Sequence, residues 1–321
     1  MKCIQVAKIG GAPVLAVCTV DTPQMQPTEM LVHNAYCGIN FIDVYHRSGV
    51  YAVSLPFVPG REAAGTVVAV GALVAGYQAG DRVAYTGTAT YAELTAVNPH
   101  RAVALPQQIS FATGAAVLLQ GLTALTIAKI PSLPPNATVL VHAAAGGTGL
   151  LLVQVLKSMN ITVIGVVSSA LKQKIAEDAH CDHVINRTTT NVVQRVLEIT
   201  QDRGVACVFD GVGQSTLDIS LASLARFGML VSFGNASGKI TDFELLKLAP
   251  KCITLARPSL FAHLKSDEEY KNAANELMLL VESGQVRFDV VKEYELADAH
   301  MAHTDLEAGG TVGKLVLKIG I

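Results

Sequence analysis

Short apolar runs and amphipathic stretches alternate along the second half of the chain. The apolar runs are rich in β-branched residues and occupy 138–143, 162–167, 183–186, 206–210, 229–234 and 252–256. They are almost continuously apolar, as is typical of strands that are covered on both faces. Helical patterns such as LKQKIAEDA and NVVQRVLEIT lie between them. Six strands that alternate with helices predict an α/β fold with a doubly wound parallel sheet, the Rossmann arrangement.

The first part of the chain has a different pattern, in which short apolar runs are separated by glycine and proline. These runs occupy 3–9, 29–38, 65–71, 81–87 and 91–97. Their length and the turn residues between them predict a β-rich domain. A helix is expected to begin at Ser110 and to end before the turn PSLPPN.

The tail of the chain bears on the division into domains. After about residue 258 the pattern predicts one long helix near 267–284, a strand, a short helix and a closing strand, GKLVLKI. A complete six-stranded sheet has no place for that closing strand, so we expect the tail to return to the first domain. The predicted domains are therefore 1–124 with 259–321, and 125–258.

A glycine-rich turn follows the first apolar run of the second half. It reads Ala144-x-Gly146-x-x-Gly149, with a further glycine at Gly147 and with Thr148 at the start of the next helix. The N-terminus of a helix presents unpaired N–H groups and partial positive charge, which suit a pyrophosphate. We predict that Gly146, Gly147 and Thr148 bind a dinucleotide; the alternative is a plain strand–helix turn without a ligand.

The end of the second predicted strand indicates which dinucleotide this is. An NAD site usually has an acidic residue about 20 residues after the glycine turn, where it binds the ribose 2′-hydroxyl. This chain has Ser168 and Ser169 there, followed by Lys172, and Arg187 follows the third strand. Hydroxyls and cations suit a 2′-phosphate, so we predict NADPH. The alternative is that Lys172 and Arg187 are ordinary surface cations.

Composition excludes several classes of function. Half of the residues are hydrophobic and the net charge is −2, so nothing indicates a nucleic-acid-binding surface. The six cysteines form no C-x-x-C pair and have no zinc-finger spacing, which favours free thiols. No secretory signal is expected, and no apolar run is expected to approach the roughly 18 residues of a membrane span. We expect a soluble cytoplasmic protein.

Several stretches resemble the medium-chain dehydrogenase/reductase superfamily, and in particular its zinc-free quinone oxidoreductase branch, the ζ-crystallin group. They are CGINFIDVYHRSGVY (37–51), VPGREAAGTVVAVG (58–71), AGDRVAY (79–85), LLQGLTA (118–124), HAAAGGTGLLLVQ (142–154), MLVSFGNASG (229–238) and ARPSL (256–260). The resemblance covers nearly the whole chain. It implies a GroES-like catalytic domain followed by a Rossmann domain.

The departures from the zinc-dependent members concern the metal. Where those members have zinc ligands, this chain has Asn40, Arg61 and Gln120, and residues 81–100 contain no cysteine of a structural zinc lobe. Asn, Arg and Gln do not form a zinc site. The resemblance therefore implies a metal-free enzyme. Without a Lewis acid an alkoxide is hard to stabilise, which argues against alcohol oxidation. A quinone or enone, by contrast, accepts a hydride into a conjugated system that delocalises the charge.

The resemblance also implies roles for individual residues. It places the nicotinamide between the domains, with Asn40, Tyr45 and Tyr51 as the catalytic candidates. Asn40 is expected to bind a ribose or substrate oxygen, and the tyrosines to stack on the quinone or donate to it; half-buried aromatics without a catalytic role are the alternative. The further cofactor-binding candidates are Thr123, Phe233, Gly234, Asn235, Leu260, Phe261 and Lys314, although Lys314 is nearly as well explained as a solvated lysine. Asp43 is expected to anchor a turn, and no histidine is assigned chemistry.

The predicted function is therefore NADPH-dependent quinone reduction by direct hydride transfer. An alkenal or enone reductase that acts on an activated C=C bond is the first alternative. A structural or RNA-binding, crystallin-like role is the second, although the acidic balance disfavours RNA. The last two strands of the predicted sheet approach an exposed edge, which is a liability unless it is covered or paired. The resemblance implies that two such edges pair in a symmetric homodimer; the alternative is a monomer whose edge is covered by ARPSL or the following helix.

Overall fold

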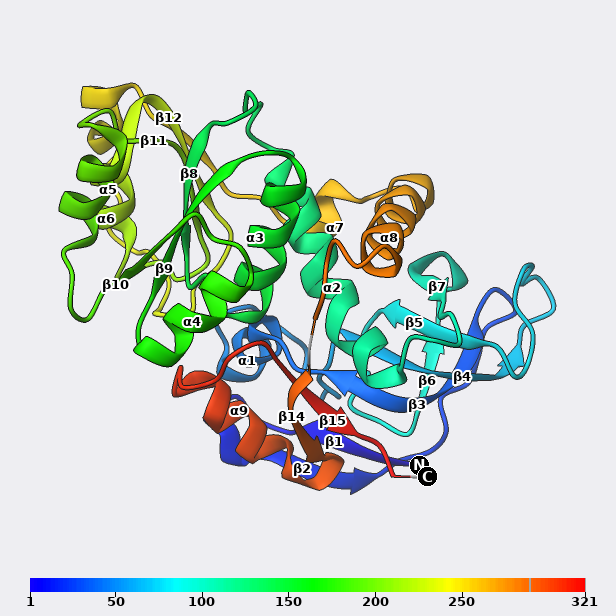
Figure 1. Cartoon of the computed structure of the whole chain (residues 1–321). Coiled ribbons are helices and arrows are strands. Elements are labelled where there is room, and N and C mark those ends of the chain that lie inside the picture. Colours follow the sequence, from blue (N-terminus) through cyan, green and yellow to red (C-terminus); the bar gives the residue numbers. More distant parts are fainter. Residues whose placement is uncertain (289, 321) are drawn as a thin grey trace. The chain divides into compact units, whose positions relative to one another are not determined.

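The chain forms two compact units in the computed structural model, which describes residues 1–288 and 290–320 (Figure 1). The first unit comprises Met1–Gln120, Ser266–Leu277 and Phe288–Ile321. The second unit comprises Gly121–Lys265 and Met278–Arg287. The chain passes between the units within helix α2 (Phe111–Ala128) and within helix α8 (Asp267–Glu282).

The second unit is built on a six-stranded parallel sheet. Its strands are β8 (Thr138–His142), β9 (Thr162–Val167), β10 (His183–Asn186), β11 (Val205–Asp210), β12 (Leu224–Ser232) and β13 (Thr254–Ala256). Their order is β10-β9-β8-β11-β12-β13, and every neighbouring pair is parallel. This confirms the predicted doubly wound sheet. Because β8 has β9 on one side and β11 on the other, the winding changes direction between β8 and β11.

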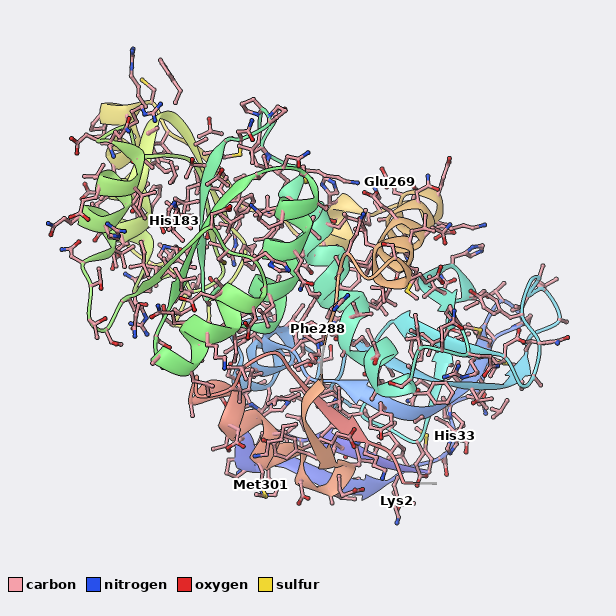
Figure 2. The ribbon with its side chains drawn as sticks, viewed as in Figure 1. Lys2, His33, His183, Glu269, Phe288 and Met301 are labelled. Atoms are coloured by element: carbon pink, nitrogen blue, oxygen red, sulfur yellow. The ribbon has the colours of Figure 1, made fainter. Side chains whose placement is uncertain are left out.

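Helices cover both faces of this sheet. Helices α3 (Gly147–Ser158) and α4 (Ala170–Asp178) lie on one face, and α5 (Val192–Thr200) and α6 (Leu217–Ser223) lie on the other (Figure 1). Side chains of the strands and helices fill the space between them (Figure 2). Leu140, Val208 and Leu230 from three adjacent strands are fully buried in this core. Each such side chain stabilises the fold by about 1.5–3 kcal/mol.

The first unit is rich in strands, as predicted. A hairpin pairs β1 (Lys2–Val6) with β2 (Leu15–Thr19), and a larger sheet has the order β14-β15-β3-β4-β5-β7, with β6 also paired to β3. The larger sheet comprises β3 (Met30–Gly38), β4 (Glu62–Val70), β5 (Arg82–Thr86), β6 (Leu94–Val97), β7 (Ala102–Ala104), β14 (Val290–Glu295) and β15 (Lys314–Lys318). Strand β15 pairs antiparallel with β3. The closing strand thus lies in the first unit, but residues 259–265 and 278–287 of the tail belong to the second unit, so the predicted domain bounds are not those of the structure.

Two helices of the first unit carry or neighbour candidate site residues. Helix α1 (Phe41–Ser48) follows β3, and helix α9 (Ala299–Glu307) precedes β15. The sequence patterns did not predict α1, because its eight residues FIDVYHRS mix buried polar and apolar side chains. Strands β2 and β7 were also not predicted, and β7 is only three residues long.

Helix α2 corrects one expectation about membranes. Its 18 residues have a mean hydropathy of 1.6, so by length and composition it is able to span a bilayer. The expectation that no apolar run approaches this length was wrong, because scattered Gly, Thr and Gln residues conceal how apolar the segment is. In the structure 78% of the helix is buried, which is typical of a core helix in a soluble protein. A cytoplasmic location stays a prediction.

Candidate active site

The predicted glycine turn lies between β8 and α3, at the carboxyl edge of the parallel sheet. Ala143 has a left-handed backbone, with φ of 52°, and its carbonyl accepts a hydrogen bond from Gly146 N at 2.8 Å. A Cβ at Gly149 would lie 2.2 Å from that carbonyl oxygen, so the packing requires glycine. Gly146 is the N-cap of α3, and within the described chain no side chain caps this helix. The first N–H groups of α3 therefore suit an anion.

Two cations lie near the carboxyl ends of the adjacent strands β9 and β10. Ser168 and Ser169 follow β9, and Ser169 Oγ accepts a hydrogen bond from Lys172 N at 3.3 Å. Arg187 follows β10, and its backbone N–H donates to Val167 O at 2.9 Å. Burial, and next the Arg187 guanidinium, lower the pKa of the Lys172 ammonium. The structure thus brings the predicted 2′-phosphate residues together, with like charges that a bound anion would stabilise.

The loop after β12 packs against the loop after β11. A Cβ at Gly234 would lie 2.2 Å from the carbonyl oxygen of Gly211, so these backbones touch. Arg257, just beyond β13, donates from Nη1 to Ser232 O, Ser232 Oγ and Gly234 O, at 3.1 Å each. The predicted segment 233–235 is therefore held rigidly at the edge of the sheet. Arg257 was not among the predicted site residues, although its position directly after a predicted strand was a usable signal.

Three other cofactor candidates are partly exposed. Leu260 and Phe261 open the short helix α7 (Leu260–His263), and both are half-buried. Thr123 is half-buried on α2. Their assignment to the cofactor stays a prediction.

Asn40 and Lys314 belong to one buried polar cluster in the first unit. Lys314 Nζ donates to Asn40 Oδ1 at 2.7 Å and also forms an ion pair with Glu62 Oε1. Asn40 Nδ2 donates to the same Glu62 oxygen at 2.7 Å, and the other Glu62 oxygen accepts from Leu119 N at 2.8 Å. Burial lowers the pKa of Lys314, whereas Glu62 opposes that shift. Lys314 is therefore neither solvated nor open to solvent, and its contacts orient Asn40.

The two predicted tyrosines belong to an aromatic group that also contains Phe41 and His46. The rings of Tyr45 and Tyr51 lie edge to face with centroids 5.3 Å apart, and Phe41 lies 6.1 Å from Tyr45. Tyr45 is buried, whereas Tyr51 is 37% exposed. His46 Nε2 lies 3.4 Å from a guanidinium nitrogen of Arg61. Burial, and next Arg61, lower the pKa of His46 to about 4, so this imidazole is neutral near pH 7.

The residues at the former zinc-ligand positions do not fit a metal ion. Asn40 is engaged by Glu62 and Lys314, and Arg61 presents a cation. Gln120 Oε1 is buried and has no hydrogen-bond partner among the described residues. Across the described parts of the chain, no group of three His, Cys, Asp or Glu side chains is arranged to hold a metal. An ammonium in contact with Asn40 and Glu62 would repel a divalent cation there.

A histidine that received no chemical assignment lies directly before the glycine turn. His142 is buried at the end of β8, and its Nε2 lies 3.1 Å from Ser220 Oγ. Ser220 donates to Asp210 Oδ2 at 2.8 Å, and Thr216 also donates to this carboxylate. Because the serine lies between histidine and aspartate, this is not the order of a nucleophilic triad. The sequence offered one signal, since Asp210 ends one predicted strand and His142 lies one residue before the end of another.

A second buried chain of this kind lies in the first unit. Tyr91 OH donates to Asp43 Oδ2 at 3.1 Å and lies 3.1 Å from His303 Nε2. Asn40 N donates to the same Asp43 oxygen at 2.9 Å, so Asp43 anchors the start of α1. Burial raises the pKa of Asp43 to about 7. Burial, and next Arg47, lower the pKa of His303 to about 3.

Two family models match the chain. The zinc-binding dehydrogenase model matches residues 147–279, and the alcohol dehydrogenase GroES-like domain model matches residues 26–107. The second match agrees with the β-rich pattern of the first unit. The first match covers most of the parallel sheet and begins at the N-terminus of α3.

Relatives match over nearly the whole chain. It is 40% identical over 321 residues to a quinone oxidoreductase of Pseudomonas aeruginosa, covering 98% of this chain and 99% of that protein. It is 30% identical to a 2-haloacrylate reductase of a Burkholderia species, covering 91% of each. The crystal structure of an Escherichia coli quinone oxidoreductase complexed with NADPH has a TM-score of 0.96 and 39% identity, covering 99% of this chain and 100% of that one.

Proposed function

This chain belongs to the quinone oxidoreductase branch of the medium-chain dehydrogenase/reductase superfamily and is an NADPH-dependent quinone oxidoreductase. From this premise we propose which of its residues bind the cofactor and the quinone. The glycine turn and the N-terminus of α3 bind the pyrophosphate of NADPH. Ser168, Ser169, Lys172 and Arg187 bind its 2′-phosphate. The aromatic group of α1, with Tyr45 and Tyr51, receives the flat quinone ring.

The pairing of Lys172 with Arg187 is the observation that carries the cofactor assignment. Lys172 and Arg187 follow the carboxyl ends of the paired strands β9 and β10, and burial, followed by the charge of Arg187, lowers the pKa of Lys172. Two like charges are costly without an anion, and a 2′-phosphate supplies up to two negative charges. The glycine turn fits the same ligand, since no side chain among the described residues caps the N-terminus of α3 and its first N–H groups suit the pyrophosphate. When bound, NADPH supplies the hydride.

The protein contributes orientation rather than a metal or a strong acid. Lys314 and Glu62 fix the Asn40 amide, so its position does not depend on the substrate. Tyr45 and Tyr51 offer ring faces for stacking and hydroxyl groups that can donate to a quinone oxygen. The neutral His46 leaves the Arg61 guanidinium as the nearby positive charge. We propose direct hydride transfer to the quinone, with a proton from water or a tyrosine.

Cofactor titration tests the assignment. NADPH should bind more tightly than NADH, and Lys172→Ala should lose about 1.5–3 kcal/mol of NADPH binding, the value of a charge-assisted hydrogen bond. NADH affinity should change little. Lys174→Ala is the matched control, because Lys174 is an exposed lysine on the same helix. Equal affinity of the wild-type chain for NADPH and NADH would refute the 2′-phosphate site.

A second candidate activity is reduction of an activated C=C bond. The observation that favours it is the 30% identity to a 2-haloacrylate reductase. NADPH oxidation should be compared with benzoquinone, naphthoquinones, enals and 2-haloacrylate, before and after dialysis against a chelator. We expect the quinones to give the highest kcat/KM, and the chelator to leave every rate unchanged. Stoichiometric zinc, or rates highest with the alkenes, would contradict these assignments.

We further propose a symmetric homodimer. Strand β13 ends the sheet and pairs only with β12 among the described strands. Apolar side chains are exposed on this edge strand and on the segments next to it: Leu255 on β13 (38%), Phe227 on β12 (66%), and Leu245 (74%) and Leu246 (80%) before β13. Such an edge is a pairing site unless it is covered. Association through it would bury this apolar surface.

Light scattering tests this assembly. The mass should be twice the 33.7 kDa of one chain and should survive moderate salt. Leu246→Lys should shift it towards one chain, whereas Leu171→Lys, at a 64% exposed leucine on α4, should not. A wild-type mass near 33.7 kDa would show that the edge is capped within one chain.

A further inference from the structure

The His142 chain lies at the point where the winding of the sheet changes direction. His142 ends β8 and Asp210 ends β11, and these two strands are neighbours in the sheet. In doubly wound sheets a crevice opens outside the carboxyl ends of the two strands at this point, and ligands bind there. The side chains of His142, Ser220 and Asp210 are all buried. They therefore connect the two strands from inside the unit.

The hydrogen bonds determine the tautomer of His142. Ser220 has one hydroxyl proton, which it donates to Asp210 Oδ2 at 2.8 Å. Its oxygen must then accept from His142 Nε2 at 3.1 Å, so Nε2 carries the proton of the neutral ring. Burial lowers the pKa of His142, while Asp210 raises it and Arg187 lowers it further. The ring therefore acts as a hydrogen-bond donor to Ser220.

The same chain reaches both loops at the crevice. Asp210 Oδ1 accepts from Val212 N at 2.8 Å and from Gly213 N at 3.0 Å, so the carboxylate shapes the loop after β11. At the other end of the chain, His142 is bonded to Ala143, whose carbonyl packs against Gly149 at the start of α3. A displacement of His142 would therefore be transmitted to the glycine turn.

We propose that His142 is a positioning residue for the dinucleotide, acting through Ser220 and Asp210 to hold the glycine turn and the loop after β11 in register. This rests on the proposed binding of NADPH at the glycine turn. The role is independent of the 2′-phosphate, because it concerns the pyrophosphate end of the site. Loss of the hydrogen bonds that join His142, Ser220 and Asp210 should therefore weaken the binding of NADPH and of NADH by the same factor. Loss of Lys172 should weaken the binding of NADPH alone.

Fluorescence titration of the full chain with NADPH and with NADH tests this. His142→Phe replaces the imidazole with another flat aromatic ring that has no donor to Ser220, and should weaken both cofactors about tenfold, equivalent to about 1.4 kcal/mol. His142→Gln can donate from its Nε2 and should restore both affinities to within about threefold of the wild type. Thr200→Val is the matched control. Thr200 is a buried hydroxyl on α5 that bonds Val196 O and Gly204 N, away from the carboxyl edge.

The thermal midpoint of each variant separates positioning from general stability. His142→Phe and Thr200→Val should both lower Tm, but only His142→Phe should change cofactor affinity. Unchanged affinity in His142→Phe would overturn the proposal, and so would a loss confined to NADPH, which would indicate an effect through Arg187. A wild-type chain that reduces no quinone would contradict the proposed function alone, because these titrations need no quinone.

Discussion

Each unit contains a buried chain in which a hydroxyl group links a histidine to an aspartate, but the two aspartates are held differently. Asp210 in the second unit accepts hydrogen bonds on both oxygens, from two backbone N–H groups and from the hydroxyls of Thr216 and Ser220. Asp43 in the first unit accepts on Oδ2 only, from Asn40 N and Tyr91 OH. Its Oδ1 is buried and has no partner within the described chain.

The difference in hydrogen bonding indicates that the two aspartates have different roles. Backbone N–H donors favour the ionised carboxylate and, in return, the carboxylate determines the conformation of the loop that supplies them. A carboxylate that is bonded on one oxygen is poorly compensated for its burial, which is why the pKa of Asp43 is raised to about 7. We infer that Asp210 sets the geometry of the loop after β11, whereas Asp43, in the first turn of α1, is a titrating group.

The matched substitutions Asp210→Asn and Asp43→Asn should give the largest effect. At position 210 the amide oxygen can keep the two backbone donors, but the NH2 would face the hydroxyls of Thr216 and Ser220, which must give up their present hydrogen bonds to accept from it. We therefore expect a loss of about 3 kcal/mol in the free energy of unfolding. At position 43 the amide oxygen can keep both hydrogen bonds while the NH2 replaces the unpartnered Oδ1. The loss there should be below about 1 kcal/mol. Urea unfolding at pH 7 measures both values; equal losses would abolish the distinction between the two chains.

His303 and Asp43 should contribute to the pH dependence of stability with opposite signs. The folded pKa of His303 is about 3, below its unfolded value of about 6.5, so its contribution to stability is present above pH 6.5 and is lost as pH falls. The folded pKa of Asp43 is about 7, above its unfolded value, so its contribution has the opposite sign and grows as pH falls. Between pH 6.5 and 4.5 the two contributions offset each other in the wild-type chain.

Replacing either Asp43 or His303 should reveal the contribution of the other residue to the pH dependence of the free energy of unfolding. Asp43→Asn should lose stability on acidification more steeply than the wild type, by up to about 1.4 kcal/mol per pH unit. His303→Gln should change in the opposite direction. Unfolding free energies at pH 6.5, 5.5 and 4.5 measure the slopes, and the other titrating groups cancel in each comparison with the wild type. Parallel slopes for all three proteins would mean that neither group is perturbed.

The sequence patterns predicted the regular parts of the molecule better than its polar interior. The parallel sheet could be predicted because each strand is apolar over its own length, and the glycine turn because Gly146 and Gly149 lie in one short stretch. The buried pair of Lys314 and Glu62 could not, since the two residues are 252 positions apart and each alone resembles a surface residue. His142 and Ser220, 78 positions apart, were missed for the same reason.

The smallest expected effect concerns the middle hydroxyl of each chain. Tyr91→Phe and Ser220→Ala each remove one hydrogen-bonding hydroxyl and leave a histidine N–H unpaired, so each should lose about 1 kcal/mol of unfolding free energy. Their effects on cofactor binding should differ. Ser220→Ala should weaken NADPH and NADH by about as much as His142→Phe does, because it breaks the same link between His142 and Asp210. Tyr91→Phe should leave both affinities unchanged, since its chain ends at α1 and has no hydrogen bond to the parallel sheet among those described. Titration of both variants beside their unfolding curves checks this, and a Tyr91→Phe protein with the weaker cofactor binding would reverse the roles of the two chains.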